Sequence, residues 1–196
     1  RRQRQMCIRD RGNTVIDFDT PQSVTIFGHD GIKRTDKDFF SAYVLTHILG
    51  GSGFGSRLMT ELREKNGLTY GVSAYLASWE KADLILGQFA SSNNTVMEAI
   101  GIVRKEWAAL ADRGVTADEL QDAKTFLTGA YPLRFDGNSR IARILTGMQI
   151  QGLPIDYIHT RNAKVNAVTM EDIKRVATRI LKQKNLYFVI VGRPTP

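Results

Sequence analysis

Residues 47–72 read HILGGSGFGSRLMTELREKNGLTYGV and are the most informative stretch of the chain. Its glycine-rich part, residues 50–56, follows an amphipathic segment and leads into a second one at 57–65, which predicts a flexible turn between two helices. Asn and Gly at 66–67 suit the left-handed turn that ends a helix. A strand-like run begins directly afterwards at Leu68. The stretch therefore predicts helix, turn, short helix and strand in that order.

Four segments are rich in the β-branched, aromatic and leucine residues that are typical of strands. They are Gln22–Gly28, Leu68–Ser78, Asp83–Ala90 and Asn185–Val191. Only a short connection at Trp79–Ala82 separates the second from the third, which predicts a β-hairpin. The last segment is nearly all apolar, the pattern of a strand that is covered on both faces or lies in the centre of a sheet.

The other periodic segments predict helices. They run over Asp36–Leu49, from Thr95 to Gly114, from Thr116 toward Pro132, and over Ser139–Gln151, Ile155–Ala163 and Met170–Lys182. Thr95 and Thr116 each precede a Glu by three residues, which predicts two capping boxes, and Thr169 is expected to cap the last helix. This order of strands and helices predicts an α+β domain, with a largely antiparallel sheet and helices packed on it.

The formal charge of +7 is concentrated at the N-terminus. Residues 1–11, RRQRQMCIRDR, hold five Arg and one Asp, a net charge of +4 that leaves +3 for the rest of the chain. This stretch lacks apolar periodicity and resembles translated adapter sequence at the ends of assembled environmental genes. We therefore expect residues 1–12 to be a disordered tail and a candidate artefact, followed by one domain at 13–196. The remaining charges are mixed and no run approaches the ~20 apolar residues of a membrane span, so neither nucleic acid nor a membrane is expected as a partner.

Several familiar catalytic patterns are absent from the sequence. The glycine-rich turn does not fit a phosphate-binding loop, because Arg57 comes one place too late for the required Lys and a helix precedes the loop. None of His29, His47 and His159 has a second ligand at helical spacing, and the chain contains no H-x-x-E-H or H-E-x-x-H. With Cys7 as the single cysteine, we expect no metal or cofactor site in this chain, and His47 is expected to be packed or half-buried.

Arg63 and Tyr70 are the candidate functional pair. Arg63 falls in the last turn of the predicted short helix and Tyr70 opens the strand after the reversal at 66–67, so the two side chains can point into the same space. A guanidinium and a phenol donate hydrogen bonds that suit a peptide carbonyl, and suit the oxyanion of a tetrahedral intermediate better still. On local sequence alone, a solvated Arg and a sheet Tyr remain the simpler interpretation.

The 47–72 stretch resembles the second, inactive domain of the pitrilysin/insulinase metallopeptidases, the inverted-zinc-motif family. The resemblance extends over about residues 15–193 and includes TPQSVTIFG at 20–28, GVTADELQDAKTFLTGAYPLRFD at 114–136 and LYFVIVG at 186–192. It implies a half-clamshell domain like those of the mitochondrial processing peptidase. In that family an Arg, followed seven residues later by a Tyr, reaches across the clamshell into the active site, and Arg63 and Tyr70 match this spacing.

The resemblance implies the substrate-holding, non-zinc-binding half of a zinc metalloendopeptidase that degrades or processes unfolded peptides. Arg63 and Tyr70 would bind the substrate backbone and stabilise the transition state in a composite active site. Zinc and the H-x-x-E-H motif would come from a partner domain upstream or from a separate subunit, as in heterodimeric bacterial members, so no peptidase activity is expected from this chain alone. The alternative is a structural or peptide-binding scaffold subunit without proteolytic activity. The compartment stays open between bacterial cytoplasm and periplasm.

Overall fold

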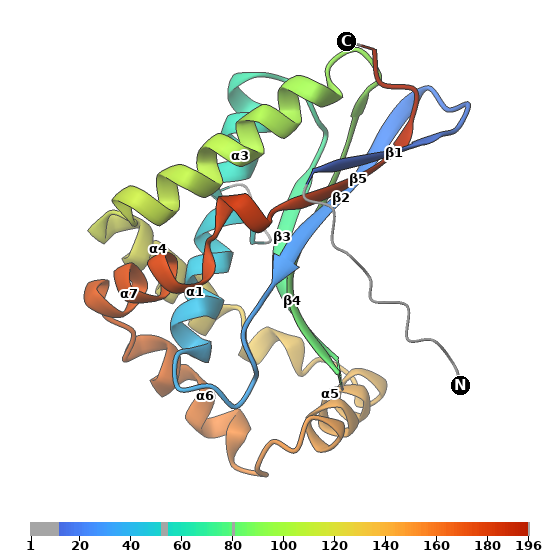
Figure 1. Cartoon of the computed structure of the whole chain (residues 1–196). Helices are drawn as coiled ribbons and strands as arrows, with labels where there is room; N and C mark the ends of the chain where they lie inside the picture. Colours follow the sequence, from blue (N-terminus) through green and yellow to red (C-terminus); the bar gives the residue numbers. More distant parts are fainter. Residues whose placement is uncertain (1–11, 52–54, 80, 196) are drawn as a thin grey trace, which may run out of the picture.

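The computed structural model describes residues 12–51, 55–79 and 81–195. A single five-stranded sheet has the strand order β1-β5-β2-β4-β3, and helices pack on one of its faces (Figure 1). Strand β1 pairs with β5 in parallel, and every other pair is antiparallel. The predicted α+β fold with a largely antiparallel sheet is confirmed.

The strands run over Asn13–Asp17 (β1), Gln22–Asp30 (β2), Val72–Trp79 (β3), Ala82–Ser92 (β4) and Tyr187–Gly192 (β5). The predicted hairpin is confirmed, with β3 and β4 paired so that Trp79 lies opposite Ala82. β1 was not predicted, because all five of its residues are exposed and the strand has no apolar face of its own. Gly12, assigned to the predicted tail, already accepts a hydrogen bond from the Phe188 amide at 3.2 Å, and residues 1–11 lie outside the described residues.

Alternation along the strands turns one face of the sheet toward the helices. In β2, Phe27 and His29 are buried, whereas Val24 and Ile26 on the opposite face are each about half exposed. β5 follows the same rule, with Phe188 fully buried and its neighbours partly exposed. Of the two predicted alternatives for this last strand, the structure gives the interior position, because β5 lies between β1 and β2 and is covered on one face.

The predicted helices are all present, with shifted ends. They are α1 (Phe39–Gly50), α2 (Arg57–Met59), α3 (Val96–Arg113), α4 (Ala117–Gly129), α5 (Asn138–Ile150), α6 (Tyr157–Asn166) and α7 (Met170–Ile180), together with the π-helical turn η1 (Thr60–Lys65) and the 3₁₀ turns η2 (Pro132–Arg134) and η3 (Gln183–Asn185). Pro132 begins a turn beyond the end of α4, as expected of a residue that cannot continue a helix.

Two of the three predicted helix caps form. Thr116 and Thr169 each accept a hydrogen bond from the third residue of the following helix and complete a capping box. The capping box predicted at Thr95 is wrong, because its hydroxyl does not accept an amide of α3. The Thr95 hydroxyl instead lies 2.9 Å from the Ser91 hydroxyl and 2.6 Å from that of Ser92, so a local side-chain cluster replaces the cap.

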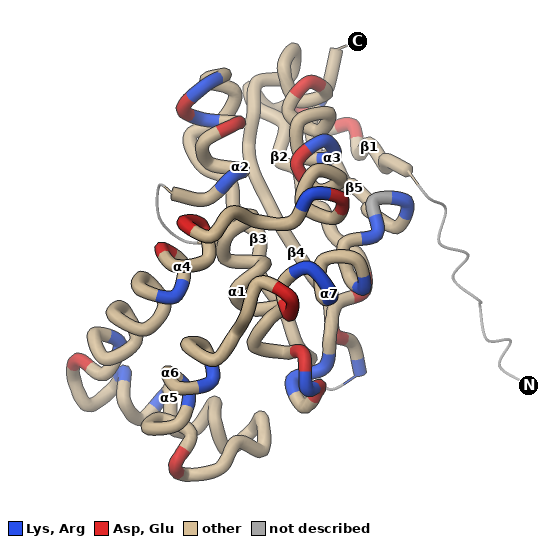
Figure 2. The backbone as a smooth tube through the Cα atoms, turned by 90° about the vertical axis from the view of Figure 1, so that its left-hand side faces the viewer, with Lys and Arg blue, Asp and Glu red and all other residues tan. Residues whose placement is uncertain are grey.

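The core lies between the sheet and the helices α1, α3 and α7. Trp107 of α3 is fully buried, and its indole N–H donates to Nε2 of His29 at 3.1 Å. Figure 2 shows Lys and Arg interspersed with Asp and Glu over most of the described residues, although every charged residue after Asp172 is basic. Among the described residues, none of the helices combines the length and the apolar character that a membrane crossing requires.

Candidate functional site

The short helix after the glycine-rich turn is anchored by two leucines. Leu58 of α2 and Leu62 of η1 are both fully buried, so the helix cannot rotate about its axis without exposing them. At its end, Gly67 takes the left-handed conformation with φ of 62°, and the Leu68 amide donates to the Leu62 carbonyl at 2.8 Å. The wide π-helical turn that carries Arg63 is a form often found at functional sites.

Arg57 helps to fix the short helix in place. Its guanidinium is bonded to protein groups and is not placed to bind a phosphate. Its guanidinium holds Glu119 with two hydrogen bonds, Nε to Oε1 at 2.6 Å and Nη2 to Oε2 at 2.8 Å, and a third bond reaches the Gly114 carbonyl at 3.0 Å. The pair ties the start of α2 to the start of α4. Residues 52–54 of the glycine-rich turn, which entered the phosphate-loop comparison, lie outside the described residues.

Two side-chain hydrogen bonds hold the loop between the short helix and β3. Thr69 is buried, and its hydroxyl lies 2.7 Å from the Ala90 carbonyl oxygen. The Ser91 hydroxyl donates to the Leu68 carbonyl at 2.6 Å. Both contacts attach the loop to the end of β4. The backbone of Tyr70 is therefore held in place, although the tyrosine side chain itself is 91% exposed.

Arg63 and Tyr70 line the same open hollow, which has a volume of about 750 Å³. The rest of its lining comes from the ends of the neighbouring strands and the connecting loop: Gln22, Gly67, Leu68, Thr69, Gly71, Ala90, Ser91, Ser92 and Thr95. Arg63 is half-buried at the base of the short helix, while Tyr70 projects into solvent. Neither Gln22 nor the hydroxyl cluster of Ser91, Ser92 and Thr95 was selected from the sequence. The two adjacent serines were the only sequence signal for this cluster.

The chemistry of this hollow is that of a hydrogen-bond donor surface. Among the described residues that line it, no carboxylate, imidazole or thiol is present. The guanidinium of Arg63 and the phenol of Tyr70 can bind and polarise a carbonyl oxygen. Among the described residues of this lining, none is a general base of the kind that activates water.

Gln22 and Ala90 contribute to the hollow from β2 and β4, in the sheet that α1, α3 and α7 cover on one face (Figure 1). Gln22, at the start of β2, points to the same face as Val24 and Ile26 because side chains alternate along a strand. Ile26 lies opposite Val189 of β5, and Tyr75 of β3 is 47% exposed. Val24, Ile26 and Tyr75 are thus apolar or aromatic side chains that stay about half exposed on this sheet.

The residues present do not fit a zinc site. Within the described residues, no three His, Cys, Asp or Glu side chains gather as metal ligands. Burial, with a smaller effect of Arg161, lowers the pKa of His47, whose ring stacks on Phe126 at 5.0 Å between centroids. Burial also lowers the pKa of His29, whose Nε2 already accepts the Trp107 indole N–H. His47 is half-buried in its helix, as predicted.

Comparison with known proteins places this architecture in a family. Residues 8–127 match the family described as the peptidase M16 inactive domain. The crystal structure of a peptidase M16 inactive domain from Pseudomonas fluorescens superimposes with a TM-score of 0.84 and 29% identity, over 95% of this chain and 44% of that one.

Curated relatives give the same result at the level of sequence. The "Non-peptidase homolog YmxG" of Helicobacter pylori is 29% identical over 93% of this chain and 42% of its own length. An "Uncharacterized zinc protease" of Streptomyces coelicolor is 30% identical over 90% of this chain and 38% of its own length. The chain thus spans less than half the length of either relative. It belongs to the peptidase M16 inactive-domain family, the inactive half of the pitrilysin/insulinase metallopeptidases.

Proposed function

We propose that this domain is the substrate-holding half of a zinc metalloendopeptidase that degrades or processes unfolded peptides. Arg63 and Tyr70 contribute hydrogen-bond donors to a composite active site, and the partner half supplies the zinc and the base that activates water. The observation that carries the proposal is the hollow itself, since both side chains line one surface whose described residues include donors and no general base. Such a surface stabilises a developing oxyanion only when the attacking group comes from elsewhere.

The open face of the sheet supports a peptide as the substrate. Beside the hollow, Val24 and Ile26 remain 48% and 50% exposed, and together they offer apolar surface for an extended chain to cover. An extended, unfolded peptide would cover these side chains while its carbonyl groups reach Arg63 and Tyr70.

The partner is a polypeptide that carries H-x-x-E-H. It is either the remainder of the same chain or a separate subunit, and both arrangements are compatible with relatives more than twice as long as this domain. The exposed Tyr70 ring would lie near that half, and burial of the ring would bring its hydroxyl into a drier setting where a hydrogen bond is stronger.

A scaffold without proteolytic activity is the second candidate. The Helicobacter pylori relative is called a non-peptidase homolog, so at least one similar protein carries a name that denies peptidase activity. In that case Arg63 and Tyr70 would hold a peptide without any reaction. The fold is the same for both functions, and only the behaviour of the assembled protein separates them.

The test is the rate of peptide hydrolysis by the zinc-loaded assembly that carries variants of this domain. Arg63→Gln and Tyr70→Phe should each lower kcat by about 10²–10³-fold, the usual effect of removing an oxyanion donor, with a smaller change in KM. Arg113→Gln, at the exposed end of α3, is the matched control and should keep wild-type rates. Unchanged melting temperatures would exclude misfolding. If Tyr70→Phe and Arg63→Gln retain wild-type turnover, the assigned role of the pair is wrong.

A further inference from the structure

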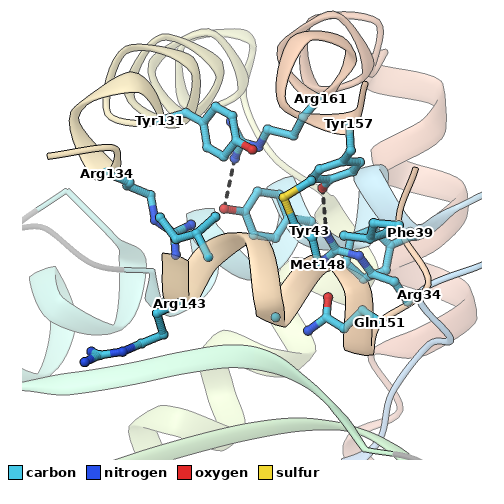
Figure 3. Close-up of a pocket in the computed structure, with 13 residues that line it drawn as sticks. Arg34, Phe39, Tyr43, Tyr131, Arg134, Arg143, Met148, Gln151, Tyr157 and Arg161 are labelled. Atoms are coloured by element: carbon cyan, nitrogen blue, oxygen red, sulfur yellow. Dashed lines mark hydrogen bonds between the residues drawn. The ribbon is translucent and has the colours of Figure 1, made fainter. Parts of the chain in front are cut away.

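A second pocket lies between α1, η2, α5 and α6, and it has a volume of about 370 Å³ (Figure 3). None of its lining residues lines the hollow of Arg63 and Tyr70. Four arginines line it: Arg34, Arg134, Arg143 and Arg161. Among the described residues that line the pocket, no Asp or Glu offsets these four positive charges. A concave site with an uncompensated charge attracts ligands of the opposite sign.

Arg161 is fixed at the inner end of the pocket. It is only 4% exposed, yet it is bonded to neutral groups: Nη1 donates to the Leu127 carbonyl at 2.6 Å and Nη2 to the Tyr43 hydroxyl at 3.0 Å. Its guanidinium also stacks over the Tyr131 ring at 4.5 Å from the centroid. Among the described residues no carboxylate pairs with this buried guanidinium, so its positive charge is not neutralised inside the pocket.

Arg34 is held in a similar way on the other side. Its Nη2 donates to the Tyr157 hydroxyl at 2.6 Å, and its guanidinium lies 4.3 Å from the centroid of the Phe39 ring. Burial raises the pKa of Tyr157, and likewise that of Tyr131, so neither phenol ionises near neutral pH. The tyrosines therefore orient the arginines without neutralising them.

Arg134 and Arg143 remain available to a ligand. Both are exposed, and neither guanidinium forms a hydrogen bond or an ion pair with any residue in the described part of the chain. Figure 3 shows them on the side of the pocket opposite Arg34 and Phe39, from η2 and α5 respectively. Each of these guanidiniums can form paired N–H···O bonds with an oxyanion. Figure 3 shows the Arg143 side chain extended away from the pocket centre, so it would turn inward to reach an oxyanion beside Arg134.

The remaining walls of the pocket are apolar. Met148 of α5 is 8% exposed and lines the pocket together with Tyr43 (Figure 3). Phe39 and Leu153 extend this surface. The site thus combines a cationic rim with an aromatic and aliphatic interior, as in pockets that bind small organic ligands by a few polar groups and a larger apolar contact.

We propose that this pocket binds an oxyanion, carboxylate or phosphate, attached to an aromatic or aliphatic group. A peptide that ends in a hydrophobic residue carries this chemistry at its C-terminus, and so does a small phosphorylated aromatic molecule. Arg134 and Arg143 hold the oxyanion at the rim, and the Phe39–Met148 surface receives the apolar part. The site requires neither zinc nor the partner half, so its binding is independent of the proposed peptidase function.

Calorimetric titration of the 196-residue chain tests this assignment. The probes are a short peptide ending in Phe with a free carboxylate, the same peptide as its C-terminal amide, phenyl phosphate and inorganic phosphate. We expect binding tighter than about 1 mM for the free acid, for phenyl phosphate or for both, and no measurable binding of the amide. A stronger response to the acid identifies a peptide end as the ligand, and a stronger response to phenyl phosphate identifies a phosphorylated small molecule.

The double variant Arg134→Gln/Arg143→Gln should lose at least about tenfold in affinity, since it removes charge-assisted bonds from exposed positions that do not support the fold. Arg140→Gln is the matched control, because Arg140 is also exposed on α5 but does not line the pocket, and it should bind like the wild type. Raising the salt concentration should weaken binding. The proposal is wrong if acid and amide bind equally, if the double variant binds like the wild type, or if no probe binds.

Discussion

Replacing Trp107 by Phe would test how the helical layer is joined to the sheet. Trp107 is fully buried in α3, and its indole lies edge-on to Phe27 and to His29, with ring centroids 5.9 and 5.5 Å apart. Its N–H donates to His29 Nε2 at 3.1 Å, while His29 Nδ1 lies 2.7 Å from the Asp30 carbonyl. This arrangement fixes the neutral tautomer of His29 with the proton on Nδ1.

The loss of stability follows from two effects. Phe cannot donate a hydrogen bond, so Nε2 of His29 becomes a buried acceptor without a partner, which costs about 1–3 kcal/mol. The smaller ring also leaves a void in a fully buried site, which adds about 1 kcal/mol. Together the free energy of unfolding should fall by about 2–4 kcal/mol. For a chain of this size, the melting temperature should fall by roughly 4–16 °C.

Urea denaturation followed by circular dichroism measures the change directly. Trp79→Phe is the matched control, since the other tryptophan of the chain is 57% exposed at the end of β3, and it should change stability by less than about 0.5 kcal/mol. The control variant also isolates the fluorescence of Trp107. If Trp107→Phe is no more destabilised than Trp79→Phe, the hydrogen bond and ring contacts of Trp107 do not hold α3 against β2, and the reasoning is wrong.

Two further predictions concern backbone contacts and pH. In urea denaturation, Gly87→Ala should lower the free energy of unfolding by about 1–3 kcal/mol, because the new Cβ would lie 2.2 Å from Cζ of Phe27. Gly101→Ala in α3 should raise it by about 0.5–1 kcal/mol, because the new Cβ would have no atom of another residue within 4 Å. A hydrogen bond from Arg179 is the main cause that lowers the pKa of Asp36 from 3.8 to about 2, so this carboxylate stabilises the fold above about pH 4 and loses its effect as the pH falls through about 2. The difference in melting temperature between wild type and Asp36→Asn should therefore shrink over that range, and a constant difference would contradict the assignment.

Most of the fold could be predicted from the sequence because helix ends and hairpins are encoded locally. Thr116 and Thr169 cap the helices that their spacing predicts. Thr95 has the same spacing and fails, because the neighbouring hydroxyls of Ser91 and Ser92 compete for it. Strand β1 could not be predicted, because its five exposed residues form a strand only beside β5, at the far end of the chain.

The same distinction applies to the two sites. Arg63 and Tyr70 are separated by one short turn, so local geometry predicts that they share a space. The arginine pocket has no local signature. Arg34 meets Tyr157 across 123 positions of sequence and Arg161 meets Tyr43 across 118, so only the packing of α6 against α1 brings these groups together.

Peptide hydrolysis before and after assembly with an H-x-x-E-H-containing half tests the central claim most directly. The substrate is an unfolded peptide with a fluorophore and a quencher, and each sample is measured with and without a zinc chelator. The account predicts no cleavage by this domain, cleavage by the assembly, and loss of that cleavage on chelation. Cleavage by the domain alone, or an assembly that binds peptide in the presence of zinc and never cleaves it, would contradict the account, and the second result would assign the domain to a scaffold.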